Sequence, residues 1–242
     1  MALQHFLLLI LISFLGAEAK IREITNLREV TIVNKCNTTI WPGFILATGQ
    51  VNEEGFELKP EESGIIKFNV GVALIWGRKG CSFDPSGRGN CTSGDCGGLL
   101  RCVKQHFPVP PVTLVSLFLN IEMDMYGISL AGGFNIPISI LPYGNSSNEC
   151  KSVSCNSDLN KACPEELQVR VNGRTVACKS ECLAFKTPEF CCIGNGGYGT
   201  SKTCRITNSS RVFKETCPTA TVHGYGQEMF TCYRSNYLIR FC

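Results

Sequence analysis

Three cysteines crowd into the stretch NCTSGDCGGLLRC, which runs from Asn90 to Cys102. Cysteine thiolates bind zinc, exchange electrons or attack substrates, whereas oxidised cysteines form disulfides that hold a loop in shape. Zinc sites and thioredoxin-type redox sites use the spacing C-x-x-C, which occurs nowhere in this chain. Beyond the N-terminal region the only histidines are His106 and His223, and neither lies at ligand spacing from a cysteine pair. We therefore expect a disulfide-bonded loop, with no metal and no cofactor.

The size and composition of the chain limit what it can be. Its 242 residues are 44% hydrophobic, which is enough for one large or two small domains with a core. The sixteen cysteines are an even number, as complete pairing requires. The formal net charge is only +3 and no arginine-rich run is present, so we expect no nucleic-acid partner.

The N-terminus predicts the cellular compartment. Phe6–Gly16 is an apolar run too short to span a bilayer, and Ala17–Ala19 follows it as an A-x-A cleavage signal. We interpret residues 1–19 as a signal peptide and residues 20–27 as an N-terminal leader. No second apolar run reaches membrane length, so we expect no membrane span and a secreted protein, extracellular or apoplastic, with the vacuole as the alternative. That oxidising route favours pairing of all the cysteines, although spacing alone leaves the pairing open.

The hydrophobic pattern is that of a β-rich protein. Alternating or β-branched stretches predict strands at Val30–Cys36, Gly64–Arg78 with a break at Gly71, Thr113–Ile121, Ile128–Pro142 and Thr231–Cys242. Residues 79–111 are rich in Gly, Cys and Pro, which predicts an irregular loop region. From Cys150 to Cys217 the strand pattern fades. There Ser180 is a candidate N-cap for a short helix that Pro188 would limit.

A family resemblance rests on the opening stretch and its neighbours. GRGNCTSGDCGGLLRC (Gly87–Cys102) resembles the signature of the thaumatin-like family, the group-five pathogenesis-related proteins of plants, with Ser93 in place of the usual Thr. The resemblance extends from about Arg28 to Cys242. Its supporting blocks are Ile75–Gly89, Gly133–Ile138, Glu189–Cys192 and Ser235–Cys242.

The resemblance implies an all-β fold, a β-sandwich of about eleven strands with two smaller disulfide-rich subdomains. The sandwich, domain I, would take residues 28–78, 112–156 and 218–242. Domain II, with a short helix, would take residues 157–217, and the loop domain III residues 79–111. The implied disulfides are Cys36–Cys242, Cys81–Cys91, Cys96–Cys102, Cys150–Cys232, Cys155–Cys217, Cys163–Cys178, Cys182–Cys191 and Cys192–Cys204.

The family resemblance also implies a cleft between domains I and II. In antifungal members the cleft carries an Arg, a Glu and three Asp, and two carboxylates there are a means of weak β-1,3-glucan hydrolysis. Judged by their flanking residues, the five family positions correspond to Leu74, Ser116, Gly127, Gly132 and Gly226, or Gln227 in place of Gly226. None of the five charges is retained, so we expect a protein without catalytic activity that binds a cell-wall glycan or a protein.

Two alternative functions remain open from the sequence. Glu122, Asp124 and Glu228 are candidate substitute acids for a weak β-1,3-glucan hydrolase, with Glu122 and Asp124 expected in a solvated turn between two strands. A protein inhibitor of a microbial hydrolase, acting through loops, is the other alternative. We expect Asp84 and Asp95 to hold loop backbone, and His223 to be a surface residue.

Four N-x-[ST] sequons predict glycosylation in exposed loops. They stand at Asn37, Asn90, Asn145 and Asn208. Asn90 is a poor acceptor because Cys91 occupies the middle position of its sequon. The expected partners are a β-glucan or another cell-wall glycan, or a secreted microbial protein, bound by a monomer.

Overall fold

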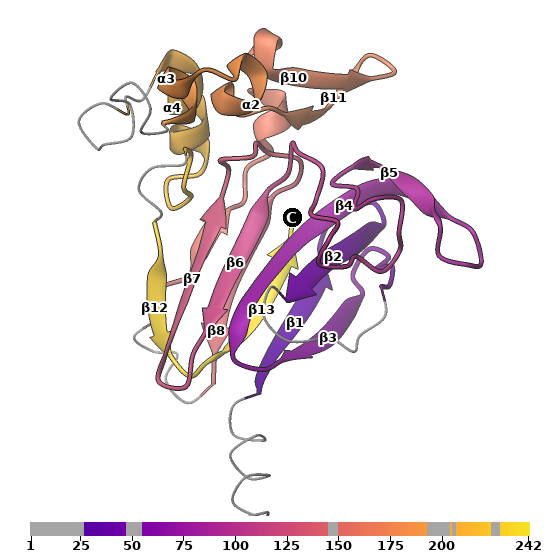
Figure 1. Ribbon diagram of the computed structural model, residues 1–242, viewed down its shortest axis with the longest axis vertical. Coiled ribbons are helices and arrows are strands. Elements are labelled where there is room, and N and C mark those ends of the chain that lie inside the picture. The colour runs from indigo at the N-terminus through magenta and orange to yellow at the C-terminus, as the bar shows by residue number, and fades with distance from the viewer. Residues whose placement is uncertain (1–26, 47–54, 145–149, 193–203, 205–206, 224–227) are drawn as a thin grey trace, which may run out of the picture.

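The computed structural model describes residues 27–46, 55–144, 150–192, 204, 207–223 and 228–242 (Figure 1). The predicted signal peptide and all but the last residue of the leader lie outside the described residues. Two sheets form the body of the molecule, one of five and one of six strands. The all-β class and the sandwich of about eleven strands are therefore confirmed.

The strands of each sheet come from distant parts of the chain. The five-stranded sheet has the order β3 (Ser63–Phe68), β1 (Arg28–Asn34), β13 (Asn236–Phe241), β8 (Ile138–Tyr143), β9 (Val153–Cys155). The six-stranded sheet has the order β12 (Phe230–Tyr233), β7 (Met123–Ser129), β6 (Leu114–Leu119), β4 (Gly71–Phe83), β2 (Ile40–Leu46), and β5 (Gly89–Ser93) pairs with β4. The first and last strands, β1 and β13, pair in parallel at the centre of their sheet.

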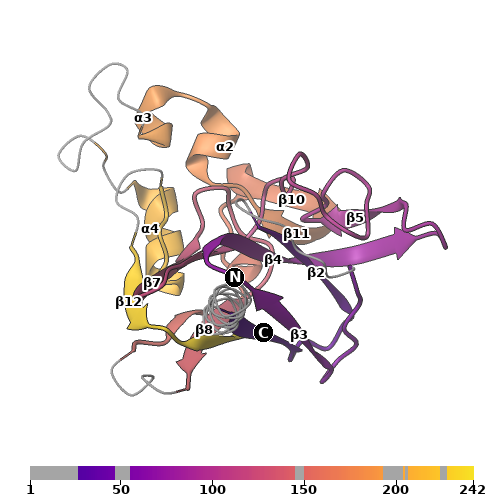
Figure 2. The same ribbon diagram turned by 60° about the horizontal axis from the view of Figure 1, so that its bottom comes forward.

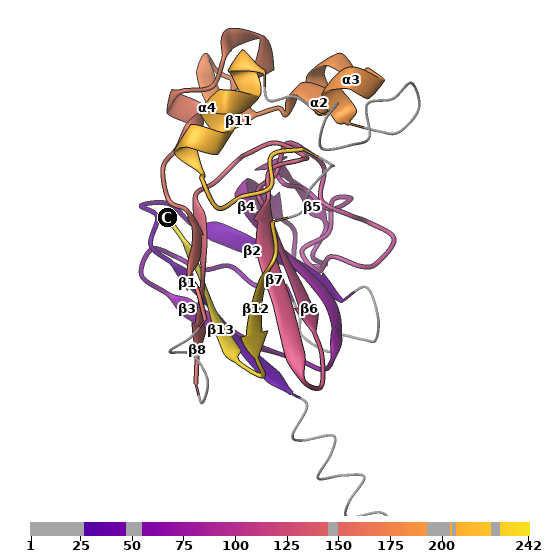
Figure 3. The same cartoon turned by 90° about the vertical axis from the view of Figure 1, so that its left-hand side faces the viewer.

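The core lies between the two sheets, which Figure 3 shows as two layers. Side chains alternate along each strand, so one face of a strand is buried and the other is not. In β6 the buried side chains are Val115, Leu117 and Leu119, and in β1 they include Val30 and Ile32. This pattern follows from the alternating sequences of these strands and fixes which residues face away from the core.

The disulfide-rich end of the molecule is domain II of the prediction. It holds two 3-10 turns, η2 (Leu159–Lys161) and η3 (Glu165–Leu167), a hairpin of β10 (Gln168–Val171) and β11 (Arg174–Cys178), and helices α2 (Glu181–Phe185), α3 (Pro188–Cys191) and α4 (Asn208–Thr216). The predicted N-cap is confirmed, because Ser180 Oγ accepts a hydrogen bond from the Leu183 N–H at 3.2 Å. Figures 1 and 2 place α3 and α4 beyond β7 and β12, and the hairpin toward β5.

The structure corrects several predicted elements. Residues 79–111 are not wholly irregular, since β4 continues to Phe83 and pairs with β5. The predicted strand Ile128–Pro142 is the end of β7, a connection, and β8. The predicted strand Thr231–Cys242 is two strands in different sheets, because the chain turns at Arg234, whose φ is 42°. The hairpin β10–β11 and helix α4 were not predicted. The domain boundaries themselves stay a prediction.

All sixteen cysteines are joined in the structure, in the eight pairs that the resemblance implied. Cys36–Cys242 links the ends of the central strands across a sequence separation of 206. So many disulfides form and persist in an oxidising compartment, which places the protein on the secretory route. Among the described residues, no helix is long and apolar enough to cross a membrane.

Candidate functional site

Three of the five family cleft positions lie in one row across the six-stranded sheet. Leu74 of β4 pairs with Ser116 of β6, and Ser116 pairs with Gly127 of β7. Cross-strand partners share a face, and the residues on either side of Ser116 point into the core. The row therefore lies on the outer face of the sheet, below the disulfide-rich end (Figure 1).

A cavity of about 150 Å³ opens over the middle of this row. Its lining is Leu114, Ser116, Gly127, Ile128, Ser129, Ala131, Thr221, His223 and Met229. No carboxylate is among these residues, and the polar groups are three hydroxyls and one imidazole. His223 was expected at the surface, but it is half-buried and borders this cavity. The arrangement suits a neutral ligand group, and it offers no carboxylate for proton transfer beside the one imidazole.

The family cleft positions that do not line this cavity are placed less centrally. Leu74 packs beside Trp76 and Val112 under the signature loop. A Cβ on Gly132 would come only within 3.9 Å of Pro110, so this edge of the site is open. Gly226 and Gln227 lie outside the described residues.

Gly127 explains in physical terms why a carboxylate is hard to place there. A Cβ at this position would stand 2.7 Å from the carbonyl oxygen of Glu228 and 3.0 Å from the sulfur of Met229. The chain that leads into β12 therefore lies directly on this glycine. An Asp side chain at position 127 would have to displace that backbone.

Asp124 does not belong to the cleft. It lies in β7 on the core face and is 0% exposed, so the prediction of a solvated turn is wrong for this residue. Its carboxylate accepts hydrogen bonds from Arg28 Nε at 2.9 Å, from the Asn120 N–H at 2.9 Å and from Tyr237 Oη at 3.2 Å. Asp124 is thus a structural residue inside the sandwich, and no cleft acid.

The other two candidate acids lie far apart. Glu122 is exposed in the turn between β6 and β7, as predicted. Glu228 is partly exposed and forms an ion pair with Lys214 of α4. The Glu228 carbonyl lies over Gly127, which is five residues after Glu122. At the usual rise of a strand, the backbones of Glu122 and Glu228 are therefore about 17 Å apart.

The signature loop is held by groups of the sheet. Arg78 is buried and donates hydrogen bonds to the carbonyls of Leu99 and Leu100, each at 2.7 Å. Burial lowers the pKa of Arg78 to about 10, and the nearby charge of Asp95 acts in the opposite direction. Asp95 Oδ2 accepts from the Gly98 N–H at 2.8 Å, so it holds loop backbone as expected.

The turn at Asp84 was predicted from the sequence, whereas the role of Arg78 was not. Asp84 accepts from the N–H groups of Ser86 and Arg88, each at 2.9 Å, which is the expected Asx-type turn. Hydrogen bonds, first that of the Ser86 side chain, lower the pKa of Asp84. The loop-anchoring role of Arg78 was missed, because a lone Arg within a strand gives no signal of what it holds.

One cluster of metal-ligand residue types is present among the described residues. Cys192, Cys204 and His223 have ligand atoms within 4.8 Å of one another. The two sulfurs are bonded to each other, so neither is a thiolate that binds a metal.

The predicted sequons at Asn37, Asn90 and Asn208 are exposed, whereas Asn145 lies outside the described residues.

Comparisons with known proteins agree with this fold. A model of the thaumatin family matches residues 34–242. The pathogenesis-related thaumatin-like protein 3.5 of Cryptomeria japonica is 43% identical over 217 residues, which cover 88% of each chain. Pathogenesis-related protein 5 of Arabidopsis thaliana is 42% identical over 220 residues, 88% of this chain and 90% of the relative.

A solved structure of a thaumatin-like xylanase inhibitor is also similar. It is 24% identical, with a TM-score of 0.49, and the match covers 88% of this chain and 98% of that one. The residues that the family model matches include the signature loop, strands of both sheets and all eight disulfides. This chain belongs to the thaumatin family.

Proposed function

We propose that this protein is a secreted, defence-related thaumatin-like protein that binds a cell-wall glycan or a microbial protein without hydrolysing it. The observation that carries the proposal is the lack of a carboxylate among the described residues that line the cavity over Ser116 and Gly127. Where the acidic members of the family carry charges, this chain has Leu74, Ser116, Gly127 and Gly132.

Glycoside hydrolysis needs an acid and a second carboxylate within about 5–10 Å of each other. Glu122 and Glu228 are too widely separated along β7 to flank one glycosidic bond, and the Glu228 side chain is directed to Lys214 of α4. Asp124 is on the opposite face of β7. These placements disfavour the alternative of a weak β-1,3-glucan hydrolase with substitute acids.

A binding site does not require the pair of carboxylates that glycoside hydrolysis requires. The row from Leu74 to Gly127 gives the site a neutral, partly apolar floor, and the disulfides hold the surrounding loops in place. Such a preformed site suits recognition, because little ordering is needed when a partner binds. The apoplast, with the vacuole as the alternative, stays the predicted location.

Depletion from solution tests the binding part of the proposal. The disulfide-intact protein without residues 1–19 is mixed with insoluble β-1,3-glucan, and both the protein left in solution and the sugar released are measured. A thaumatin-like protein with an acidic cleft serves as the control. Depletion without sugar release supports glycan binding. If there is neither depletion nor sugar release, protein partners are tested next. Sugar release by this protein contradicts the proposal.

A further inference from the structure

Arg240 carries a positive charge on the outer face of the five-stranded sheet. It lies in β13 between the core residues Ile239 and Phe241, so its side chain points away from the other sheet, the second layer in Figure 3. The residue is half-buried. Its side chain forms no ion pair and no hydrogen bond with the part of the chain that the structure describes.

Ser139 of β8 is the cross-strand partner of Arg240, so the two side chains lie next to each other on the same face. Ser139 is 3% exposed. Its Oγ and the Nε of Arg240 are both buried and have no hydrogen-bond partner among the described residues. The two other atoms of this kind belong to Asp95 and Asn160, which lie outside the strands. An unpaired N–H donor and an unpaired hydroxyl are therefore neighbours only at Arg240 and Ser139 within the described ranges.

The surrounding face offers Arg240 no counter-charge. Cross-strand pairing places Arg240 in a row that has no acidic residue, and the next row along the strands has none either. In the order β3, β1, β13, β8 and β9, the first row is Ser63, Val33, Arg240, Ser139 and Ser154. The next row is Ile65, Thr31, Leu238 and Leu141.

The two acids that precede this row in the sequence are engaged elsewhere. Glu61 forms an ion pair with Lys35. Glu62 Oε2 accepts a hydrogen bond from the Lys59 N–H at 2.8 Å. Neither carboxylate is within ion-pair distance of Arg240. The guanidinium is thus partly withdrawn from water while its charge is unbalanced.

An anion would complete this pair better than a water molecule. Partial burial of a charge without a counter-charge is unfavourable. A water can bridge Ser139 Oγ and Arg240 Nε, but it does not neutralise the guanidinium. The oxygens of an anion accept hydrogen bonds from both groups, and its charge balances that of Arg240.

A change of the Arg240 rotamer would open the site. Ser139 Oγ and Arg240 Nε are closed off from solvent in the present arrangement. Since the Arg240 side chain has no hydrogen bond or ion pair to described residues, the change breaks no such contact. Side-chain rotamer changes of this kind are common on binding. The more exposed end of the guanidinium would meet the anion first, and the Ser139 hydroxyl would follow.

We infer that Arg240 and Ser139 form a binding site for a tetrahedral oxyanion, a phosphate or sulfate group. Arg240 would donate two parallel N–H bonds to two of the oxygens. The hydroxyls of Ser139 and of its half-buried neighbour Ser154 would donate to the remaining oxygens. A carboxylate has only two oxygens and would leave these hydroxyls without an acceptor. The inference goes beyond the proposed function, because the site lies on the other sheet and not in the cleft.

NMR titration of the isotope-labelled, disulfide-intact protein with inorganic phosphate, and separately with sulfate, tests the inference. The Arg240 Nε–H resonance, assigned by its loss in Arg240→Gln, should shift saturably, together with the Ser139 and Ser154 amides. Arg240→Gln should weaken phosphate binding at least about tenfold, because it removes the only charge of the site. Ser139→Ala should weaken it about fivefold, because it removes one donor.

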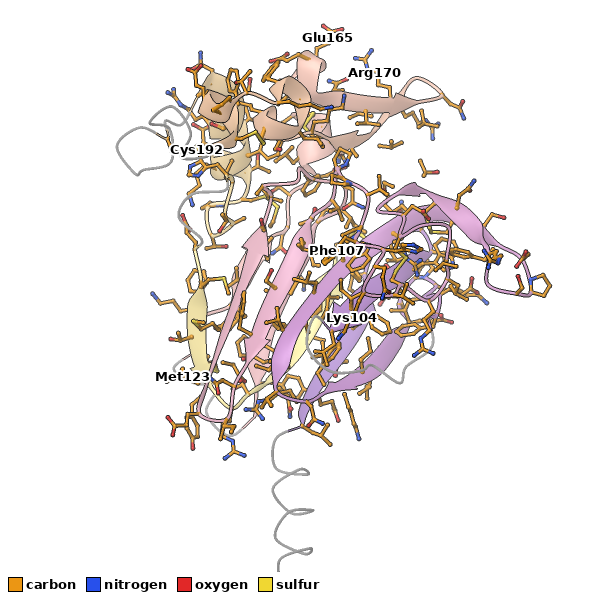
Figure 4. All side chains as sticks on the ribbon, in the orientation of Figure 1. Lys104, Phe107, Met123, Glu165, Arg170 and Cys192 are labelled. Carbon is orange, nitrogen blue, oxygen red and sulfur yellow. A yellow bond between two sulfur atoms is a disulfide. The ribbon has the colours of Figure 1, made fainter. Side chains whose placement is uncertain are left out.

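Arg170→Gln is the matched control. It removes the same charge from an exposed strand residue of the β10–β11 hairpin, which Figure 4 shows at the disulfide-rich end of the molecule. Its phosphate affinity should stay within about twofold of the wild type. Thermal unfolding shows that the variants are folded. Ser139→Ala keeps the test independent of the arginine, since the hydroxyl that it removes has no partner in the fold.

Methyl phosphate separates two sources of the anion. Equal affinity for methyl phosphate and inorganic phosphate would mean that the oxyanion alone is recognised. Tighter binding of the ester would mean that the oxyanion is a group on a larger ligand. Both results support the site.

Three outcomes overturn the inference. The first is that no resonance of Arg240 or Ser139 shifts saturably, which leaves a bridging water only. The second is that Arg240→Gln and Ser139→Ala bind phosphate as the wild type does. The third is that chloride or acetate, titrated separately, binds as tightly as phosphate. None of these results affects the proposed function, which is tested by glucan depletion and sugar release.

Discussion

Arg28 and Asp124, separated by 96 residues in the chain, form an ion pair inside the sandwich. Arg28 Nε lies 2.9 Å from Asp124 Oδ2, and the two side chains are 2% and 0% exposed. Arg28 starts β1 and Asp124 lies in β7, so the pair joins the two sheets. Of the three candidate substitute acids, Asp124 is therefore committed to the fold.

Removing one partner of this pair should destabilise the protein strongly. Asp124→Ala leaves a buried guanidinium without its counter-charge, and we expect a loss of about 3–5 kcal/mol in the free energy of unfolding. Denaturant unfolding with disulfides intact measures it. Glu122→Ala, an exposed position nearby, should change stability by less than about 0.5 kcal/mol. Equal effects of the two variants would show that the ion pair has no structural role.

The two glycines of the cleft should respond differently to a methyl group. Gly127→Ala forces a Cβ against the Glu228 carbonyl, so we expect a loss of about 1–3 kcal/mol. Gly132→Ala has room and should cost less than about 1 kcal/mol. Thermal unfolding of both variants makes the comparison. A tolerated Gly127→Ala would mean that the chain before β12 does not rest on β7.

The disulfide between the first and last strands should contribute more than a short one. Replacing Cys36 and Cys242 by Ala removes a closure of 206 residues, worth about 5 kcal/mol on the chain-entropy model. The same change at Cys81 and Cys91, which are ten residues apart, should cost about 3 kcal/mol. Unfolding by denaturant separates them. The prediction is contradicted if loss of the Cys81–Cys91 disulfide destabilises the protein more than loss of the Cys36–Cys242 disulfide.

Stability should fall at high pH through Tyr126. Burial raises the pKa of Tyr126 to about 12, and its hydroxyl donates a hydrogen bond to the Lys151 carbonyl at 2.6 Å. An unfolded tyrosine has a pKa of about 10, so between these values only the unfolded state loses the proton. The free energy of unfolding must then decrease as pH rises. Tyr126→Phe should show a shallower decrease from about pH 10 to 12, and parallel curves would refute the assignment.

Much of the site follows from the sequence because its signals are local. The signature stretch around Cys96, the N-cap Ser180 and the turn at Asp84 each depend on neighbouring residues, and the structure has all three. The loss of charge at Ser116 and Gly127 is likewise visible in the sequence. The structure adds that these two residues are direct cross-strand partners.

Other features depend on contacts that the sequence does not reveal. The pattern MDMYGIS gives Asp124 no sign of burial, because its partner Arg28 is distant in the chain. Helix α4 has few apolar residues and is set by its capping box at Thr207 and by burial of Phe213. The break between β12 and β13 falls at Arg234 and Ser235, and the positive φ of Arg234 is not visible in the apolar pattern.

Sugar release from β-1,3-glucan by the purified, disulfide-intact protein tests the central claim most directly. We predict none above the level of a buffer control, and no difference between the wild type and the double variant Glu122→Gln, Glu228→Gln. Sugar release by the wild type would contradict the claim, and its loss in the double variant would assign the activity to one or both of these carboxylates.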